Sequence, residues 1–244
     1  MQLGYIGSGN MARSLALGVG RPALFSDSGS GRAKLLAEMT AGESVSTADL
    51  AARSDVIFLC HKPKQLGDVA AVVGDFAGTI VSVLAATPIS ALRGAYPSAR
   101  IVRTMPNIPV EFGEGVLAVA AESDEAPELD DLFATLGLVV VVPEEQFELV
   151  TAIGGCAPAF FALFARDLIA AATARGLDPA QAAEVVNETL RGTGTALRAN
   201  GINPDALMTA VASPGGLTER ALLSFEESGL AGAVERAVAT VLGE

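Results

Sequence analysis

Two glycines near the start of the chain have the spacing that lets a backbone bind a pyrophosphate. An apolar run, Leu3 to Ile6, leads directly into Gly7-Ser8-Gly9, and a helical pattern begins at Asn10. The first glycine permits a tight turn, and the second lets phosphate oxygens approach the backbone without a Cβ in the way. The unpaired N–H groups at the start of the next helix favour an anion there. This strand, turn and helix predict that the chain binds NAD or NADP.

The choice between NADH and NADPH depends on the loop after the second expected strand, where Ser26 is expected to contact the cofactor. Asp27 lies where an acidic side chain accepts hydrogen bonds from the ribose hydroxyls of NAD. The same loop ends in Arg32, which can bind the 2′-phosphate of NADP. Asp27 would repel that phosphate unless it points away. The sequence therefore leaves both cofactors open, with a slight preference for NADPH.

A second glycine turn lies near the C-terminus, where Ser213-Pro-Gly-Gly-Leu-Thr218 precedes a helical pattern. Its backbone N–H groups, together with the hydroxyls of Ser213 and Thr218, can form a concave site for a carboxylate. The alternative is an ordinary helix start, in which Thr218 caps the helix and binds no ligand. The residues alone do not separate these two interpretations.

The positions of histidine and lysine limit the acid–base chemistry. His61 is the only histidine, and it follows an expected strand at the edge of the sheet where ligands bind. A histidine without an evident partner more often packs or hydrogen-bonds than catalyses, so its role stays open. The lysines are Lys34, Lys62 and Lys64. The C-terminal part of the chain therefore has no lysine to act as an acid or base.

The composition excludes several classes of protein. The chain has 244 residues, of which 50% are hydrophobic, and a formal net charge of −12. Such an acidic chain is not expected to bind nucleic acid or an anionic membrane. Cys60 and Cys156 form neither a disulfide framework nor a zinc-like spacing, so no metal site is expected. Because the first strand begins at Gln2, with no signal peptide before it, we expect a cytoplasmic protein.

The N-terminal part of the chain alternates short apolar runs with helical patterns. Continuous apolar runs separated by helices predict a parallel, doubly wound sheet. The expected strands are Gln2–Ile6, Ala23–Ser26, Val56–Cys60, Ile80–Leu84, Arg100–Thr104, Val116–Ala120 and Val139–Val142. The expected helices are Asn10–Gly18, Arg32–Met39, Gln65–Asp75, Ile89–Tyr96 and Pro127–Leu136.

After Pro143 the pattern becomes helical and stays so to the end. We therefore expect an α/β domain over residues 1–146 and an all-helical domain over residues 147–244. The most apolar helix, Ala157–Thr173, contains Arg166 and Asp167 and is expected to be too short to span a bilayer. The helical domain has more apolar surface than one small bundle can bury, which predicts an obligate dimer.

Five segments, taken in order, resemble one family of reductases. They are Gly7-Ser-Gly-Asn-Met-Ala12, His61-Lys-Pro63, Arg103-Thr-Met-Pro-Asn-Ile-Pro109, Gly154-Gly-Cys-Ala-Pro-Ala-Phe160 and Ser213-Pro-Gly-Gly-Leu-Thr218. Their order and spacing resemble pyrroline-5-carboxylate reductase, the last enzyme of proline biosynthesis, over nearly the whole chain. The Met-Pro-Asn and Ser-Pro-Gly-Gly-x-Thr segments are specific to that family rather than to Rossmann proteins at large.

The resemblance implies an α/β Rossmann-type dinucleotide-binding domain followed by an all-α dimerisation domain, in dimers that often assemble further. It implies hydride transfer from NAD(P)H to the C=N carbon of a cyclic imine carboxylate. The substrate carboxylate is then held by Ser213 and the amides of Gly215 and Gly216, while Thr218, the catalytic residue, hydrogen-bonds the ring nitrogen. The implied site is shared by two subunits. The implied cofactor residues are Gly7, Ser8, Gly9, Asn10, Met11, Lys62, Pro63, Ala85 and Asn107, the last near the nicotinamide.

This chemistry suits the residues present. A protonated imine is already electrophilic, so positioning and electrostatics can supply most of the rate without a strong protein acid. Hydroxyacid dehydrogenases of related architecture use a lysine in their helical domain, which this chain lacks. They are therefore the weaker interpretation.

The chain departs from the family pattern around the expected pocket. Ile108 stands where the family usually has threonine, and Gly154, Cys156 and Phe160 replace residues that mostly carry hydroxyl or amide groups. Arg166 replaces an acidic residue. These changes make the pocket more apolar and alter its charge. Two alternatives therefore stay open: a reductase of the same fold for a different cyclic imine acid, and a cofactor-binding dimer without catalysis.

Overall fold

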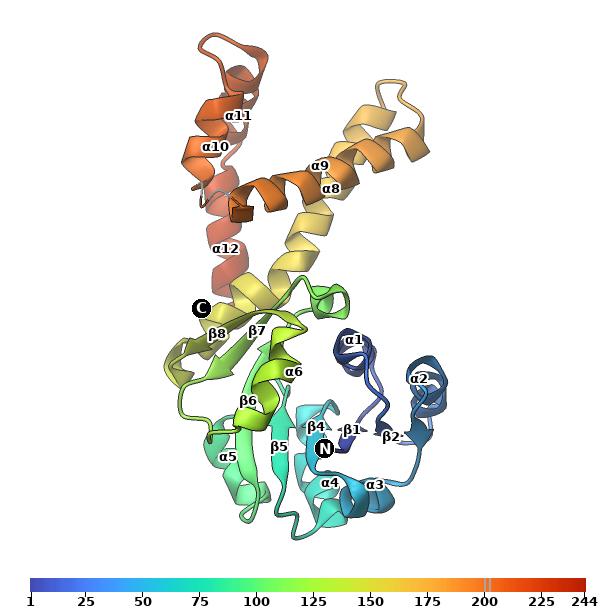
Figure 1. Cartoon of the computed structure of the whole chain (residues 1–244). Coiled ribbons are helices and arrows are strands. Elements are labelled where there is room, and N and C mark those ends of the chain that lie inside the picture. Colours follow the sequence, from blue (N-terminus) through green and yellow to red (C-terminus); the bar gives the residue numbers. More distant parts are fainter. Residues whose placement is uncertain (200, 202) are drawn as a thin grey trace. The chain divides into compact units, whose positions relative to one another are not determined.

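The computed structural model describes residues 1–199, 201 and 203–244, which form two compact units (Figure 1). Unit 1 is Met1–Cys156 and unit 2 is Ala157–Glu244. The boundary expected at residue 146 lies near the start of a continuous helical run, Glu144–Thr173. Contacts divide the chain ten residues later because the first turns of that run bury Phe147 and Ala152 within unit 1.

Unit 1 contains an eight-stranded sheet in the order β3-β2-β1-β4-β5-β6-β7-β8. The strands are β1 (Leu3–Ile6), β2 (Leu24–Ser26), β3 (Glu43–Ser44), β4 (Val56–Leu59), β5 (Thr79–Ser82), β6 (Arg100–Pro106), β7 (Gly115–Ala120) and β8 (Gly137–Val142). The first six strands pair in parallel, so their carboxyl ends lie at one edge of the sheet. The strand order reverses between β1 and β4, which makes that edge the expected position of a dinucleotide.

The seven expected strands are present, but the sheet is not parallel throughout. β7 runs antiparallel to β6, with Met105 opposite Ala118. The connection between these strands spans only residues 107–114, whereas a parallel crossover needs a dozen residues or more. β8 is in turn parallel to β7. The expectation of an all-parallel sheet is therefore wrong at this pair.

The sequence pattern does not predict β3 or helix α3 (Thr47–Arg53). β3 has two residues, Glu43 and Ser44, and both are exposed. α3 begins after Ser46, whose hydroxyl accepts a hydrogen bond from the Asp49 N–H, and it buries Leu50. A two-residue polar strand and a helix with one apolar anchor have no periodic signal to detect.

Helices cover both faces of the sheet in unit 1 (Figure 1). They are α1 (Asn10–Val19), α2 (Arg32–Thr40), α4 (Leu66–Val73), α5 (Ile89–Ala95), α6 (Asp130–Ala134) and α7 (Phe147–Val150), besides α3. One buried cluster packs α1, α2 and α6 against one face. A second cluster packs α3, α4, α5 and α7 against the other. This layering confirms the Rossmann-type architecture.

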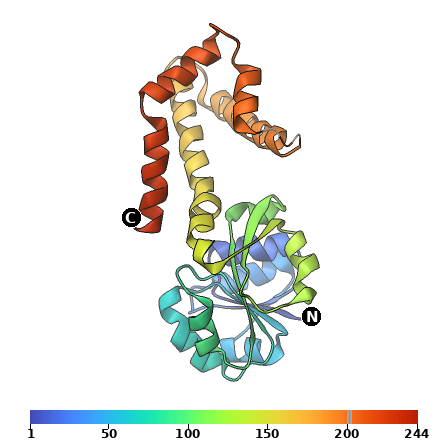
Figure 2. The same ribbon diagram turned by 90° about the vertical axis from the view of Figure 1, so that its left-hand side faces the viewer.

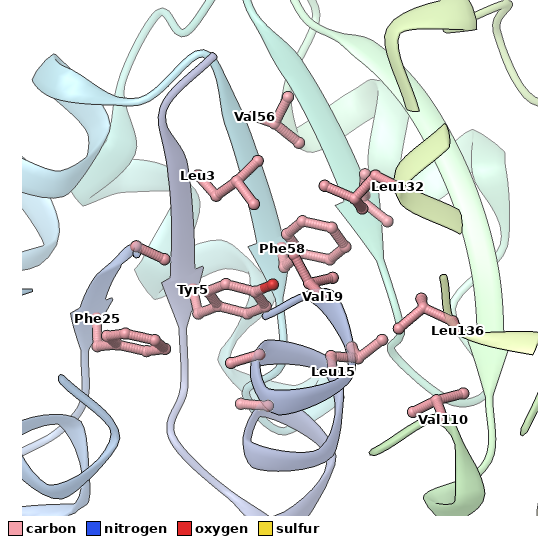
Figure 3. Close-up of a cluster of buried hydrophobic side chains, with 14 of the residues drawn as sticks. Leu3, Tyr5, Leu15, Val19, Phe25, Val56, Phe58, Val110, Leu132 and Leu136 are labelled. Atoms are coloured by element: carbon pink, nitrogen blue, oxygen red, sulfur yellow. The ribbon is translucent and has the colours of Figure 1, made fainter. Parts of the chain in front are cut away.

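Three aromatic rings form the centre of the first cluster (Figure 3). Tyr5 on β1 stacks between Phe25 on β2 and Phe58 on β4, with ring centroids 5.3 and 4.7 Å apart. Such pairs contribute about 0.5–1.5 kcal/mol each beyond the burial of their area. The stack fixes the three strands whose carboxyl ends carry the expected cofactor loops.

Unit 2 is built from helices (Figure 2). They are α8 (Ala157–Thr173), α9 (Pro179–Ala199), α10 (Pro204–Val211), α11 (Leu217–Glu227) and α12 (Leu230–Leu242). Among the described residues of this unit, the buried apolar side chains are Ala157, Ala165 and Ala182. Phe161 and Val185, by contrast, are 59% and 60% exposed. Because so little apolar surface is buried within the unit, it requires a partner surface.

The apolar helix at the junction is longer than the sequence predicts. The continuous run Glu144–Thr173 has 30 residues and a mean hydropathy of 1.7 in its most apolar window, enough by length and composition to cross a membrane. α8 itself has the expected bounds, Ala157–Thr173, and its 17 residues are too few to span a bilayer. The run is longer because α7, a π-helical turn (Thr151–Cys156) and α8 join without a break. An exposed apolar helix of this kind needs either a bilayer or a protein partner.

Candidate active site

The dinucleotide turn lies at the switch point of the sheet. Gly7 has a φ of +94°, and a Cβ there would lie 2.5 Å from the backbone nitrogen of His61. Both conformation and space therefore require glycine at this position. A Cβ on Gly9 would meet nothing within 4 Å. This leaves open space before the first N–H groups of α1, at Asn10 and Met11, which suits a pyrophosphate.

The end of β2 is tied to this turn. The Gly7 N–H donates to the Ser26 carbonyl at 2.9 Å, and the Ser8 hydroxyl donates to the same oxygen at 3.3 Å. Ser8 and Ser26 are 7% and 1% exposed. The Ser8 side chain and the Ser26 backbone carbonyl thus hold the turn in place, while the Ser26 hydroxyl accepts from the Thr47 hydroxyl at 3.1 Å. Contact of either residue with a cofactor stays a prediction.

The Asp27 carboxylate is engaged by its own loop. Oδ1 accepts from the Gly29 N–H at 2.8 Å, and Oδ2 accepts from the Ser30 hydroxyl at 2.6 Å and the Ala33 N–H at 3.0 Å. These hydrogen bonds, led by that from Ser30, lower the pKa of Asp27. The ionised carboxylate therefore caps α2. Arg32, at the same loop, is exposed.

The loop after β4 holds His61 beside the dinucleotide turn. Its Nδ1 lies 2.9 Å from the Lys62 carbonyl, which places the proton on Nδ1 and the lone pair on Nε2. Within the described residues, Nε2 is buried without a hydrogen-bond partner. Burial also lowers the pKa of His61. A neutral imidazole is therefore expected here, next to exposed Lys62 and Pro63.

The loop after β5 carries backbone strain. Ala86 has a φ of +50°, a left-handed conformation that costs a non-glycine residue about 1–2 kcal/mol. Ala85 precedes it and is exposed at the carboxyl edge. The Thr87 hydroxyl donates to the Ala85 carbonyl at 3.0 Å. Strain of this kind is common in loops that bind ligands.

Asn107, expected near the nicotinamide, holds two backbone groups. Its side-chain Oδ1 accepts from the Val116 N–H at 2.9 Å, and Nδ2 donates to the Gly154 carbonyl at 3.0 Å. The residue is 6% exposed. Both ends of the carboxamide are thus engaged, and a direct contact with the cofactor stays a prediction.

The second glycine turn forms the start of α11. The Gly216 N–H donates to the Ser213 carbonyl at 2.8 Å, and a Cβ on Gly216 would lie 2.7 Å from the Ser213 hydroxyl oxygen. Gly215 has a φ of +70°, and its N–H donates to Oε2 of Glu219 at 2.7 Å. One backbone amide of this turn therefore already binds a carboxylate, that of the chain itself.

Thr218 lines an apolar groove in unit 2 of about 580 Å³. Leucine, methionine and valine side chains from α9, α10 and α11 form much of its wall, namely Leu197, Leu207, Met208, Val211 and Leu222. The Thr218 hydroxyl, which is expected to contact the substrate, thus lies beside apolar surface. Among the described residues, no group of three or more His, Cys, Asp or Glu side chains is placed to hold a metal ion.

Sequence reasoning missed Arg103. Its side chain is 4% exposed, and its guanidinium pairs with Glu144 at 2.9 Å and with Glu148 at 3.0 Å. It also lies 4.2 Å from the ring centroid of Phe147. The sequence does show a charged residue inside an apolar strand. Such a residue needs an acidic partner, because an unpaired buried charge is costly.

Two family models match the chain. Residues 144–243 match one described as pyrroline-5-carboxylate reductase dimerisation, and residues 2–86 match one described as NADP oxidoreductase, coenzyme F420-dependent. The first match contains nearly all of unit 2 and the apolar helical run. A protein partner, rather than a bilayer, thus accounts for its exposed apolar face.

Relatives and solved structures agree with these matches. The pyrroline-5-carboxylate reductase of Treponema pallidum (strain Nichols) is 33% identical over 99% of both chains. That of Aquifex aeolicus (strain VF5) is 30% identical over 96% of this chain and 92% of its own. The structure of the Streptococcus pyogenes enzyme has a TM-score of 0.89 and 27% identity, covering 100% of this chain and 97% of that one. The NADP-bound Plasmodium falciparum enzyme has a TM-score of 0.87 and 25% identity over 99% and 95%. The chain belongs to the pyrroline-5-carboxylate reductase family.

Proposed function

We propose that this protein reduces 1-pyrroline-5-carboxylate to L-proline with NAD(P)H. The observation that carries the proposal is the Ser213–Thr218 turn, where a backbone amide already binds a carboxylate in a chain that also has an open dinucleotide turn. Each turn matches one of the two ligands of the reaction. Membership of the pyrroline-5-carboxylate reductase family supports this assignment of one turn to the cofactor and the other to the substrate.

On the cofactor side, the open space at Gly9 fits a dinucleotide pyrophosphate. The N–H groups of Asn10 and Met11 at the start of α1 would bind it, and Gly7 lets the turn pass close to His61. Ser8, Ser26, Lys62, Pro63 and Ala85 would line the rest of the cleft. When bound, NAD(P)H supplies the hydride that is added to the C=N carbon.

On the substrate side, Ser213 and the amides of Gly215 and Gly216 would hold the carboxylate. Glu219 must then release the Gly215 N–H to the substrate. The Thr218 hydroxyl would hydrogen-bond the ring nitrogen, which keeps its proton as the imine becomes an amine. Because a protonated imine needs no further activation, these residues act by orientation and electrostatics.

NADPH is the proposed preferred cofactor. The loop hydrogen bonds give the Asp27 carboxylate a structural role as the cap of α2, which weakens the case for a ribose ligand. Arg32 is exposed beside it and is suited to a 2′-phosphate. Arg32→Ala should lower kcat/KM for NADPH about 10- to 100-fold and leave that for NADH nearly unchanged, since a charge-assisted phosphate contact contributes about 1.5–3 kcal/mol. An equal loss with both cofactors would contradict this assignment.

The working form is proposed to be a cytoplasmic homodimer, able to assemble further, that acts on a small cyclic imine carboxylate. The exposed apolar face of unit 2 and the match to a dimerisation family support the dimer. A cyclic imine acid with a larger apolar group is the second candidate substrate. The apolar groove beside Thr218 and the exposed side chain of Ile108 favour it.

The deciding experiment follows the oxidation of NADPH and NADH with pyrroline-5-carboxylate and with larger cyclic imine acids. We expect the highest kcat/KM with pyrroline-5-carboxylate, and a loss of about 100-fold in Thr218→Val. Thr209→Val is the matched control, because Thr209 lies exposed on α10 and its hydroxyl donates to the Asp205 carbonyl of its own helix. Better turnover of another imine would favour the second candidate. No turnover with any imine, despite cofactor binding, would favour a non-catalytic dimer.

A further inference from the structure

Two side chains hold the helical segment Glu144–Cys156 on the sheet of unit 1. One lies in β6, and the other belongs to the residue that directly follows β6. Arg103 pairs with Glu144 and Glu148 at the start of the segment. Asn107 donates to the Gly154 carbonyl near its end. The segment is thus fixed at both ends by residues four positions apart in the sequence.

Stability alone is a poor reason for an arginine at position 103. Burying a guanidinium costs several kcal/mol, and apolar replacements of buried ion pairs are often neutral or stabilising. Among the described residues, Nε of Arg103 has no hydrogen-bond partner. The arginine instead fixes the position of the Glu144 carboxylate, which also accepts a hydrogen bond from the Ile89 N–H at 2.8 Å. Strand β6, α5 and the helical segment meet at this carboxylate.

The part of the segment that Asn107 holds is a π-helical turn, Thr151–Cys156. Such turns are frequent at functional sites. A Cβ on Gly155 would lie 3.8 Å from Cγ of Met105, and one on Gly154 would lie 3.9 Å from Cγ1 of Val116. The turn therefore faces β6 and β7 next to Asn107, with room for a Cβ at each glycine.

The position of this turn follows from the sheet. β6 is parallel to β5, so Asn107 lies at the same carboxyl edge as Ala85 and the loop after β4. The loop with Asp27, where the adenosine ribose is expected, follows β2 on the other side of the switch point. The π-helical turn therefore lies on the side of the switch point away from the expected adenosine, where the nicotinamide of a bound cofactor would be expected.

We propose that Arg103 and Asn107 are positioning residues for hydride transfer, which hold the π-helical turn Thr151–Cys156 against the nicotinamide end of the cofactor site. The proposal rests on the proposed function for the reaction itself. Asn107 then acts through the Gly154 carbonyl and not as a ligand of the cofactor.

The test compares Asn107→Asp and Arg103→Met with the wild type. Asn107→Asp keeps an acceptor for the Val116 N–H but loses the donor to Gly154. Arg100→Met is the matched control, since Arg100 is on the same strand but pairs with Glu128 at an exposed site. The readouts are the Kd of NADPH from its fluorescence, kcat and KM for pyrroline-5-carboxylate, and the primary isotope effect with deuterated NADPH.

We expect kcat to fall about tenfold or more in Asn107→Asp and Arg103→Met, because small misplacements of reacting groups carry large rate penalties. The Kd of NADPH should stay within about twofold of the wild type, because binding energy from the pyrophosphate turn is untouched. The isotope effect should rise as hydride transfer becomes slower. Arg103→Lys, which keeps a cation for one glutamate, should recover part of kcat, and Arg100→Met should match the wild type.

A large loss of NADPH affinity in Asn107→Asp, with an unchanged isotope effect, would make Asn107 a cofactor ligand and overturn the proposal. Wild-type kcat in both variants would overturn it as well. Should Arg103→Met fail to fold, Glu148→Gln removes only the more exposed partner of the pair and takes the same measurements.

Amide hydrogen exchange of residues 151–156 tests the positioning role without depending on turnover of the imine. In the wild type, NADPH should slow exchange in this turn, and Asn107→Asp should reduce that protection, whatever imine is turned over. Absence of wild-type turnover with pyrroline-5-carboxylate would count against the proposed function. Absence of NADPH-dependent protection would count against the positioning role.

Discussion

The two glycine turns of this protein are supported in different ways. The turn proposed to bind the cofactor, Gly7–Gly9 in unit 1 and called the cofactor turn below, follows a strand whose Tyr5 is buried in an aromatic stack, and Gly7 packs on the backbone of His61. The turn proposed to bind the substrate, Ser213–Thr218 in unit 2 and called the substrate turn below, is held by local hydrogen bonds from Gly215 and Gly216. The first turn lies on a buried core, and the second starts a helix in which Leu217, Leu223 and Phe225 are exposed.

The two proposed ligand sites are therefore expected to depend on assembly to different extents. Unit 1 has two buried clusters and carries the geometry of its cofactor turn by itself. Unit 2 buries too little to hold its helices in place without a second copy. Cofactor binding should therefore survive changes that abolish the dimer, whereas turnover should not.

The largest effect is expected from a charge on the apolar face of α8. Phe161→Glu places a carboxylate on a 59% exposed ring position that we expect the dimer to bury, and burying an unpaired charge is prohibitive. Turnover should fall more than about 100-fold, the mass in solution should approach that of a monomer, and NADPH binding should remain. Glu235→Lys, at an exposed polar position of α12, is the control. An active monomer of Phe161→Glu would show that turnover does not depend on the dimer.

The next effect separates the two turns directly. Gly7→Ala adds a Cβ at a positive φ and 2.5 Å from the His61 nitrogen, so the cofactor turn must shift. We expect the Kd of NADPH to rise at least about tenfold, from a strain of about 1–2 kcal/mol plus the clash. Gly216→Ala, which meets Ser213, should instead raise KM for the imine and leave the Kd of NADPH unchanged. Titration of NADPH fluorescence and steady-state kinetics measure both. If both variants changed the Kd of NADPH and the KM for the imine alike, the two turns would not bind separate ligands.

The sequence predicts the cofactor turn well and the details of unit 2 poorly, for physical reasons. A strand, two glycines and a helix are local features, so the turn at Gly7 and Gly9 follows from the chain alone. The antiparallel direction of β7 depends on the length of one connection, and the unbroken helix over Glu144–Thr173 depends on a π-helical turn that no pattern indicates. The pairing of Arg103 with Glu144, 41 positions away, is a tertiary contact that spacing cannot reveal.

A smaller effect concerns the carboxylate already bound to the substrate turn. Glu219→Ala frees the Gly215 N–H, which the glutamate otherwise occupies at 2.7 Å. KM for the imine acid should fall about two- to fivefold, because the net contribution of such a hydrogen bond is about 1 kcal/mol at an exposed site. Glu227→Ala, at the other end of α11, is the control. An increase in KM would instead mean that Glu219 supports the turn in its binding shape.

The smallest effect concerns the pH dependence of unit 1 stability. Burial lowers the pKa of His61 below its ordinary value, so the unfolded chain binds the proton more readily than the folded one. The folded state is therefore favoured above the ordinary histidine pKa of about 6.5, and this contribution is lost as the pH falls below it. His61→Gln should flatten the decrease in Tm between about pH 7 and 5, where the carboxylates of Asp27 and Asp124, whose pKa values are lowered, stay ionised. Thermal unfolding across this range checks the prediction. Because the folded imidazole keeps its Nδ1 bond to the Lys62 carbonyl, an unchanged pH slope would mean that this bond offsets the burial of Nε2.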